Sequence, residues 1–287
     1  KATPIFIDVD LDTMGLSPSA LKEFLEQNVE LKNDGSYNKK TGKKISACMP
    51  MHTFGYMCRI DEIVEICNQW KISVVEDAAE ALGSKYKGEY IGTFGDISTF
   101  SFFGNKTITT GEGGMVFFQD QDAVELAKQL RSHGMSPSRR YWHDRVGNNF
   151  RMTNVQAAIG VAQVERAGFL VDRKMEIGSL YTDGIKDIPG VSMMPASPFG
   201  QSSFWLVTVL LDEDVADKRD VLMELLAADG VQTRIAFPAL HNMPAFENFP
   251  KSTEFETSQS IEERGLSLPN TPVMKSGDVL YILSCLE

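Results

Sequence analysis

The chain has few cysteines, few histidines, no long apolar run and a shortage of positive charge. Its four cysteines, at 48, 58, 67 and 285, form no Cys-x-x-Cys pair and are too few for a disulfide scaffold. We therefore expect reduced thiols in a cytoplasmic protein. The four histidines lack the spacing of a metal site, so no metal is predicted. No apolar run approaches membrane-span length, and the first residues do not form a signal peptide. A formal net charge of −11 argues against nucleic acid and membrane as partners, since both select basic surfaces.

At 287 residues, the chain is long enough to bury a substantial core and to hold two domains. Apolar β-branched runs alternate with amphipathic helical patterns over its first half, which indicates an α/β fold with a mainly parallel sheet covered on both faces. Strands are expected at 3–9, 45–51, 72–76, 98–103 and 115–118, and helices at 17–30, 60–70, 120–133 and 153–187, the last with a candidate break at Gly168. The basic range 32–44 is expected to be a solvent-facing loop or hairpin. After a connection at 189–200, a strand at 204–211, a helix at 219–229 and a strand at 231–235 suit a small C-terminal domain.

The stretch from Ser98 to Met115 holds the first candidate catalytic residue. Its alternating start is typical of a half-buried strand, which breaks at Gly104 and is followed by Lys106. A Gly-Glu-Gly-Gly turn then leads into a second apolar run, and its glycines let backbone come close to a neighbour. A lysine held at a strand end in apolar surroundings is a candidate to form a Schiff base with a carbonyl group. The alternative is a surface lysine in a hairpin turn.

The stretch from Lys71 to Gly83 supplies a matching acid. Asp77 ends a β-branched run, at the edge where open α/β sheets place their ligands. Pyridoxal phosphate needs both groups, a lysine for the Schiff base and a carboxylate that keeps the pyridine nitrogen protonated. Ala79 would point to the same side as Asp77, and its methyl group could pack on the flat ring. The alternative interpretation, which Asp77 alone would favour, is the N-cap of a helix that follows the strand. Together with Lys106, Asp77 favours a pyridoxal 5′-phosphate site.

Two runs, VVEDAAEALGS at 74–84 and GDISTFSFFGNKTITTGEGGM at 95–115, resemble the fold type I sugar aminotransferases of the DegT/DnrJ/StrS family. The resemblance covers essentially the whole chain, and the run RRYWHDRVGNNFRMTNVQAAIG at 139–160 is most similar to the GDP-perosamine synthase branch. It implies a three-layer αβα large domain over 1–168 and a small α+β domain over 169–287. It also implies that an N-terminal part of the large domain, with a cofactor-phosphate turn and a ring-stacking side chain, is missing.

The resemblance assigns roles to individual residues. Lys106 would bind the cofactor and carry the proton, and Asp77 would pair with the pyridine nitrogen. Glu80 matches a residue that bonds the ring hydroxyl, where an ionised carboxylate is unfavourable, so we expect a shared proton or a displaced side chain. Ser101 matches a phosphate-binding serine, although it could instead bond its own backbone. Asn149 would reach the phosphate of the neighbouring subunit, which requires a homodimer. The expected substrate-binding residues are Arg151, which lies in an arginine-rich loop that suits an anionic group, Arg234 and His241, the last also interpretable as a structural histidine.

The predicted activity is transfer of an amino group from an amino acid, with L-glutamate as the expected donor, to C4 of a nucleotide-linked 4-keto-6-deoxy sugar. GDP-4-keto-6-deoxymannose is the first choice and a UDP-linked amino sugar the second, for surface polysaccharide or lipopolysaccharide O-antigen biosynthesis. Lysine rather than histidine at position 106 favours transamination over the dehydration that some relatives carry out. The rival is a non-catalytic regulatory or ligand-binding relative, because a missing phosphate turn would weaken cofactor binding.

Overall fold

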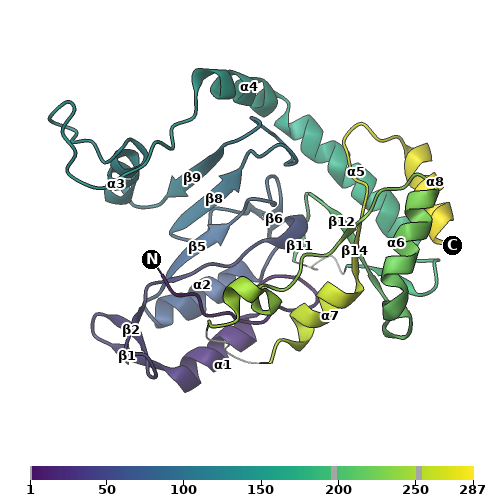
Figure 1. Cartoon of the computed structure of the whole chain (residues 1–287), viewed down its shortest axis with the longest axis horizontal. Coiled ribbons are helices and arrows are strands. Elements are labelled where there is room, and N and C mark those ends of the chain that lie inside the picture. The colour runs from purple at the N-terminus through teal and green to yellow at the C-terminus, as the bar shows by residue number, and fades with distance from the viewer. Residues whose placement is uncertain (1, 195–198, 250–253) are drawn as a thin grey trace.

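Two separate sheets organise the chain. The computed structural model describes residues 2–194, 199–249 and 254–287. The central sheet has the order β4-β5-β8-β9, and its first three strands run parallel while β9 is antiparallel to β8. These strands are β4 (Ala47–Cys48), β5 (Ser73–Asp77), β8 (Ile97–Ser101) and β9 (Gly114–Phe118). Figure 1 shows β5, β8 and β9 side by side in the middle of the molecule.

Two helices near the N-terminus pack against the central sheet. Helix α1 (Pro18–Asn28) begins where Ser17 accepts a hydrogen bond from the Ala20 amide at 3.3 Å, as expected of an N-cap. Helix α2 (Ile60–Gln69) buries Ile60, Ile63 and Cys67 against β4 and β5. Helix α3 (Gln121–Arg131) contacts β9 and begins at Asp120. All three helices were predicted within three residues of their observed ends.

The second sheet lies towards the C-terminus and is antiparallel throughout, with the order β10-β12-β14-β13. Its strands are β10 (Val191–Met193), β12 (Val207–Leu211), β14 (Gly265–Leu268) and β13 (Arg234–Ile235). Every residue of β12 and β14 is buried. Helices α5 (Ala167–Ile185), α6 (Arg219–Ala228) and α8 (Ser276–Leu286) supply the other side of its core, while α7 (Glu256–Arg264) contacts β12 and β14. The description "mainly parallel" therefore holds for the central sheet alone.

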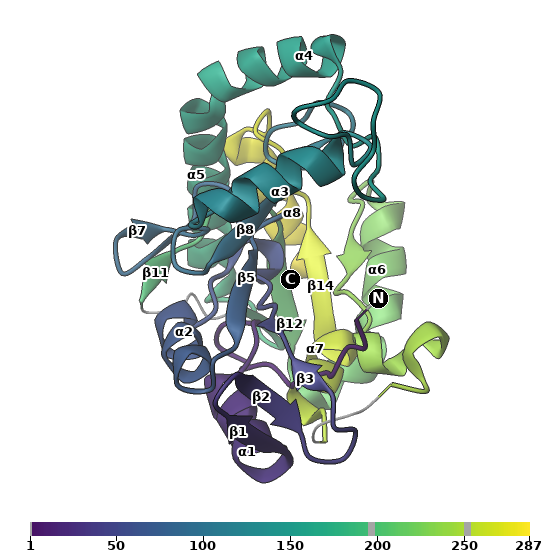
Figure 2. The same ribbon diagram turned by 90° about the vertical axis from the view of Figure 1, so that its left-hand side faces the viewer.

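The predicted long helix at 153–187 is two helices. Helix α4 (Asn154–Glu165) starts with a capping box between Thr153 and Gln156, and α5 follows after Arg166. The break falls at Arg166, where φ is −107° and ψ is 0°, and not at Gly168. In both views α4 lies at the opposite end of the molecule from α7 (Figures 1 and 2).

The range 32–44 forms a hairpin, which confirms one of the two alternatives expected there. Strands β1 (Val29–Lys32), β2 (Gly35–Asn38) and β3 (Lys44–Ile45) make a small antiparallel sheet. A second small sheet joins β6 (Lys85–Tyr86), β7 (Glu89–Tyr90) and β11 (Gly200–Gln201). The connection expected at 189–200 thus contains two short strands at its described ends, β10 and β11, while residues 195–198 lie outside the described chain. Short 3₁₀ turns occur at Thr53–Gly55, Glu213–Lys218, Leu240–Asn242 and Pro244–Phe246.

The strand predicted at 3–9 is wrong. This segment forms no ladder, since Val9 makes an isolated bridge to Leu16 and Phe6 makes a separate isolated bridge. Its side chains Ile5 and Ile7 are half-buried and pack on the central core. The segment is apolar and partly buried, as predicted. A strand also needs a second strand to form a hydrogen-bonded ladder with, and no strand in the described chain runs alongside this segment.

The described chain holds no helix that is long and apolar enough to span a membrane. Among the same residues, no group of three or more histidine, cysteine, aspartate or glutamate side chains is arranged to hold a metal ion. All four cysteines are free thiols, three of them buried.

Candidate active site

Neighbouring parallel strands bring Asp77 and Lys106 to one edge of the central sheet. Asp77 is the last residue of β5, where its amide donates to the carbonyl of Pro50 at 2.9 Å and its carbonyl accepts from the amide of His52 at 3.0 Å. Strand β8 pairs with β5 in parallel and ends at Ser101, five residues before Lys106. The carboxyl ends of parallel strands meet at the same edge, which is where α/β sheets bind ligands.

Lys106 faces Glu80 across this edge. Its Nζ lies 3.1 Å from Oε1 of Glu80, and the two side chains are 13% and 4% exposed. The other carboxylate oxygen, Oε2, accepts the backbone N–H of Phe54 at 2.8 Å. Burial raises the pKa of Glu80 and the charge of Asp77 also raises it, whereas Lys106 and the Phe54 amide lower it. Because each of these groups acts on the same carboxylate, Lys106, Glu80 and Asp77 form one cluster.

Asp77 is oriented by a local turn. Its Oδ1 accepts the backbone N–H of Ala79 at 3.1 Å, which places the carboxylate at the strand end, with Ala79 beside it. Ser101 makes the local bond that was the alternative for it, since its Oγ accepts the N–H of Phe103 at 3.2 Å. Its hydroxyl proton remains available to a further acceptor, so the local bond does not exclude a phosphate contact.

A fully buried carboxylate next to Asp77 fixes the same edge. Glu76 accepts backbone N–H groups from Gly92, Phe94 and Gly95 at 2.7 to 2.9 Å. Its Oε2 lies 3.2 Å from Nε2 of His52. Burial alone would raise the pKa of Glu76, but the His52 and backbone hydrogen bonds outweigh burial and lower that pKa. With every oxygen used inside the protein, Glu76 is a structural residue.

The other four predicted site residues lie away from this cluster. Asn149 and Arg151 are exposed on the segment between α3 and α4. Arg234 is exposed at the start of β13, and His241 is buried with its ring stacked 4.1 Å from that of Phe255. Among the described residues, no hydrogen bond or ion pair links Asn149, Arg151 or Arg234 to Asp77, Glu80 or Lys106.

Three aromatic residues that no motif indicated complete the surroundings of the lysine. The Nζ of Lys106 lies 3.8 Å from the ring centroid of Trp205. Phe54 and Phe237 lie behind that indole, each with its ring centroid 6.4 Å from the indole's. They come from three loops far apart in sequence, so the only signal in the sequence was their apolar character.

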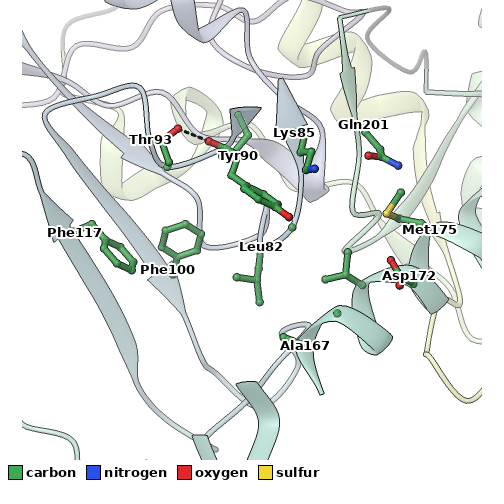
Figure 3. A pocket seen from close by; sticks show the side chains of 15 residues that line it. Leu82, Lys85, Tyr90, Thr93, Phe100, Phe117, Ala167, Asp172, Met175 and Gln201 are labelled. Atoms are coloured by element: carbon green, nitrogen blue, oxygen red, sulfur yellow. Dashed lines mark hydrogen bonds between the residues drawn. The ribbon is translucent and has the colours of Figure 1, made fainter. Parts of the chain in front are cut away.

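A cavity of about 450 Å³ lies between β8, β9 and α5 (Figure 3). Phe100 and Phe117 line it from the sheet, and Ala167 and Met175 from the helix. Strand alternation turns Phe100 to the face opposite Ser101. The residues of the lysine cluster do not line this cavity, which is therefore separate from the candidate active site.

The side chains at this edge are those that pyridoxal phosphate requires. Lys106 offers an amine for the aldehyde carbon, and Asp77 offers a carboxylate for the pyridine nitrogen. Glu80 and Ser101 add a carboxylate and a hydroxyl at the ends of the same two strands. With three parallel strands flanked by an antiparallel fourth, the fold and this group of side chains define a pyridoxal-phosphate-dependent aminotransferase of fold type I.

Comparison with known proteins agrees with that class. The chain belongs to the DegT/DnrJ/EryC1/StrS aminotransferase family, whose model matches residues 1–287. It is 39% identical over 281 residues to the GDP-perosamine synthase of Escherichia coli O157:H7, an alignment that covers 98% of this chain and 71% of that one. It is 35% identical over 289 residues to the putative pyridoxal phosphate-dependent aminotransferase EpsN of Bacillus subtilis strain 168, covering 99% and 71%.

A solved structure supports the fold. A DegT DnrJ EryC1 StrS aminotransferase from Brucella abortus superposes with a TM-score of 0.88 at 23% identity, covering 99% of this chain and 72% of that chain. The predicted family, fold class, aminotransferase class and cofactor are thus confirmed, and pyridoxal 5′-phosphate is the cofactor of this protein.

Proposed function

We propose that this protein transfers an amino group from L-glutamate to C4 of GDP-4-keto-6-deoxymannose in the cytoplasm, for surface polysaccharide or O-antigen biosynthesis. The observation that carries the proposal is the cluster of Lys106, Glu80 and Asp77 at one sheet edge, with a lysine and not a histidine at position 106. The name of the Escherichia coli relative supports the GDP-linked sugar.

Each residue of the cluster has a defined task. Bound pyridoxal phosphate supplies an aldehyde that accepts the donor's amino group and a pyridinium ring that withdraws electrons. Lys106 holds the cofactor and moves a proton through Nζ, and Asp77 keeps the pyridine nitrogen protonated. Glu80 serves the ring hydroxyl and is also the counter-charge for Nζ whenever the amine is released. The remaining proposed contacts are Ala79 on the ring, Ser101 and Asn149 on the phosphate, and Arg151, Arg234 and His241 on the sugar nucleotide.

The protein is proposed to be a homodimer whose active sites are shared, with Asn149 reaching the neighbouring site. Support comes from the segment between α3 and α4 and from α4 itself, where apolar side chains are more than half exposed. Exposed apolar side chains gathered in one part of a chain are typical of interaction sites. The side chains are Tyr141, Trp142, Val146, Phe150, Val155, Val161 and Val164.

Co-expression of two inactive variants tests the shared site. Lys106→Ala and Asn149→Ala subunits damage different positions, so a mixed dimer contains one intact site. Random pairing makes about half of the dimers mixed, and the mixture should regain about a quarter of wild-type activity. A mixture as inactive as its two parents would contradict a shared site.

The proposed domain division, 1–168 and 169–287, is supported by two of the three apolar cores in the described chain. One is built on the central sheet and the other on the antiparallel sheet. The third core, which includes Phe54 and Trp205, joins the two parts. Helix α5 begins at Ala167 and belongs to the second core through Ile177, Tyr181 and Ile185.

A substrate panel tests the proposed function. Purified protein with pyridoxal phosphate is given L-glutamate and, separately, GDP-4-keto-6-deoxymannose or a UDP-linked 4-keto sugar, and amino-sugar formation is followed by mass spectrometry. Turnover of the GDP-linked sugar, lost in Lys106→Ala, is the expected result. Turnover of the UDP-linked sugar alone would replace the proposed substrate, and no turnover with any keto sugar would favour a regulatory relative.

A further inference from the structure

Trp205 is a second contact of the reactive amine, beside Glu80. Its ring centroid is 3.8 Å from Nζ of Lys106, within the range of a cation–π contact, while Oε1 of Glu80 is 3.1 Å from the same atom. The indole side chain is part of a residue only 4% exposed. The ammonium group is therefore located by a carboxylate and an aromatic face together.

The indole also fixes the backbone next to the lysine. Its Nε1–H donates to the carbonyl oxygen of Asn105 at 2.9 Å, one residue before Lys106. One side chain thus contacts both the residue before Lys106 and the tip of the lysine side chain. The hydrogen bond also satisfies the buried indole N–H.

Trp205 is itself held rigidly. Its carbonyl accepts Nζ of the buried Lys174 at 3.1 Å, and the next amide, that of Leu206, donates to Phe54 at 3.2 Å. Gly55 allows this close approach, since a Cβ at that position would lie 2.9 Å from the Trp205 amide nitrogen and φ is +96°. These backbone contacts fix the position of Trp205 independently of Lys106.

We propose that Trp205 is a positioning residue that holds the free amine of Lys106 against its ring and directs it into the active site. The inference rests on the proposed function of Lys106 for its meaning in catalysis. The contact between the indole ring and the amine is present in the cofactor-free protein.

The first test is made on protein freed of cofactor. Lys106 is acetylated by a brief pulse of acetic anhydride at pH 8 and quantified by peptide mass spectrometry, because an amine held against the indole reacts more slowly than a free one. Trp205→Leu should increase the labelling rate by about 3- to 30-fold, the range of a partly buried cation–π contact. Trp205→Phe keeps an aromatic face and should give a smaller increase. Trp70→Phe, at a half-buried tryptophan that packs on the core around α2, is the matched control and should leave the rate unchanged.

A second test leaves Trp205 in place. In a Trp70→Phe/Trp142→Phe protein, Trp205 is the sole indole, and its emission reports on the contact with the amine. Lys106→Met, which removes the amine, should change that emission. In cofactor-loaded protein, Trp205→Phe should lower kcat more than it raises KM for the sugar nucleotide.

Equal labelling rates in wild type and folded Trp205 variants, or emission that does not respond to Lys106→Met, would overturn the inference. If Trp205→Leu does not fold, the Trp205→Phe rate and the emission test decide. If Lys106 fails to bind pyridoxal phosphate while both tests succeed, the proposed function fails and the contact stands.

Discussion

Glu80→Gln tests the electrostatics of the site in a single substitution. Glutamine keeps the shape of the side chain and can still accept the Phe54 amide, so the change is confined to the charge that faces Lys106 at 3.1 Å. At an effective dielectric constant of about 20, two unit charges at this distance attract by roughly 5 kcal/mol, an upper limit that desolvation reduces. Because burial raises the pKa of Glu80, part of this attraction only offsets the cost of keeping the buried carboxylate ionised. We expect the free energy of unfolding of the cofactor-free protein to fall by about 1 to 3 kcal/mol in Glu80→Gln.

Denaturant unfolding of cofactor-free protein measures this loss. Glu80→Asp, which keeps the charge on a shorter side chain, should lose less stability than Glu80→Gln. Equal free energies of unfolding for wild type and Glu80→Gln would refute the ion pair and the electrostatic account built on it.

Three further substitutions test the surroundings of the site. Asp77→Asn keeps an acceptor for Ala79 but loses the charge, so pyridoxal phosphate affinity, measured by absorbance titration, should fall about 10- to 100-fold. Glu76→Ala leaves three backbone amides and Nε2 of His52 without their acceptor, and denaturant unfolding should show a loss of about 3 to 5 kcal/mol. Burial lowers the pKa of Lys174 from 10.5 to about 8, so the folded state binds fewer protons than the unfolded state between these two pH values. Wild-type stability should therefore rise with pH by up to about 3 kcal/mol relative to Lys174→Met over this window, and parallel curves would contradict it.

Elements with a strong local signal were predictable from the sequence. The N-cap at Ser17, the apolar face of α2 and the β-branched run of β5 each fixed an element within a few residues. Segment 3–9 was not predictable in this way, because strand formation depends on a partner strand that its own residues do not encode. The break at Arg166 was placed at Gly168 because glycine is the stronger local signal, whereas the observed kink is at a residue with no breaking tendency.

The site was predictable to the extent that it lies on strand ends. Asp77 and Lys106 were found because each follows a recognisable strand, and neighbouring parallel strands bring such residues together. Trp205 and Phe54 were missed because they meet only in the folded chain. Trp205 lies before β12, which starts three residues later than the strand predicted at 204–211, and Phe54 lies in a 3₁₀ turn. Aromatic residues in loops have no periodicity to indicate what they contact.

The central claim is that Lys106 binds the cofactor opposite Asp77, and trapping the bound cofactor tests it most directly. Purified protein is mixed with pyridoxal phosphate, reduced with borohydride and digested, and the modified peptide is sequenced by mass spectrometry. We predict that the cofactor is attached at Lys106 and that Asp77→Asn reduces the yield of the modified peptide at limiting cofactor. Attachment at another lysine, or none at saturating cofactor, would contradict it.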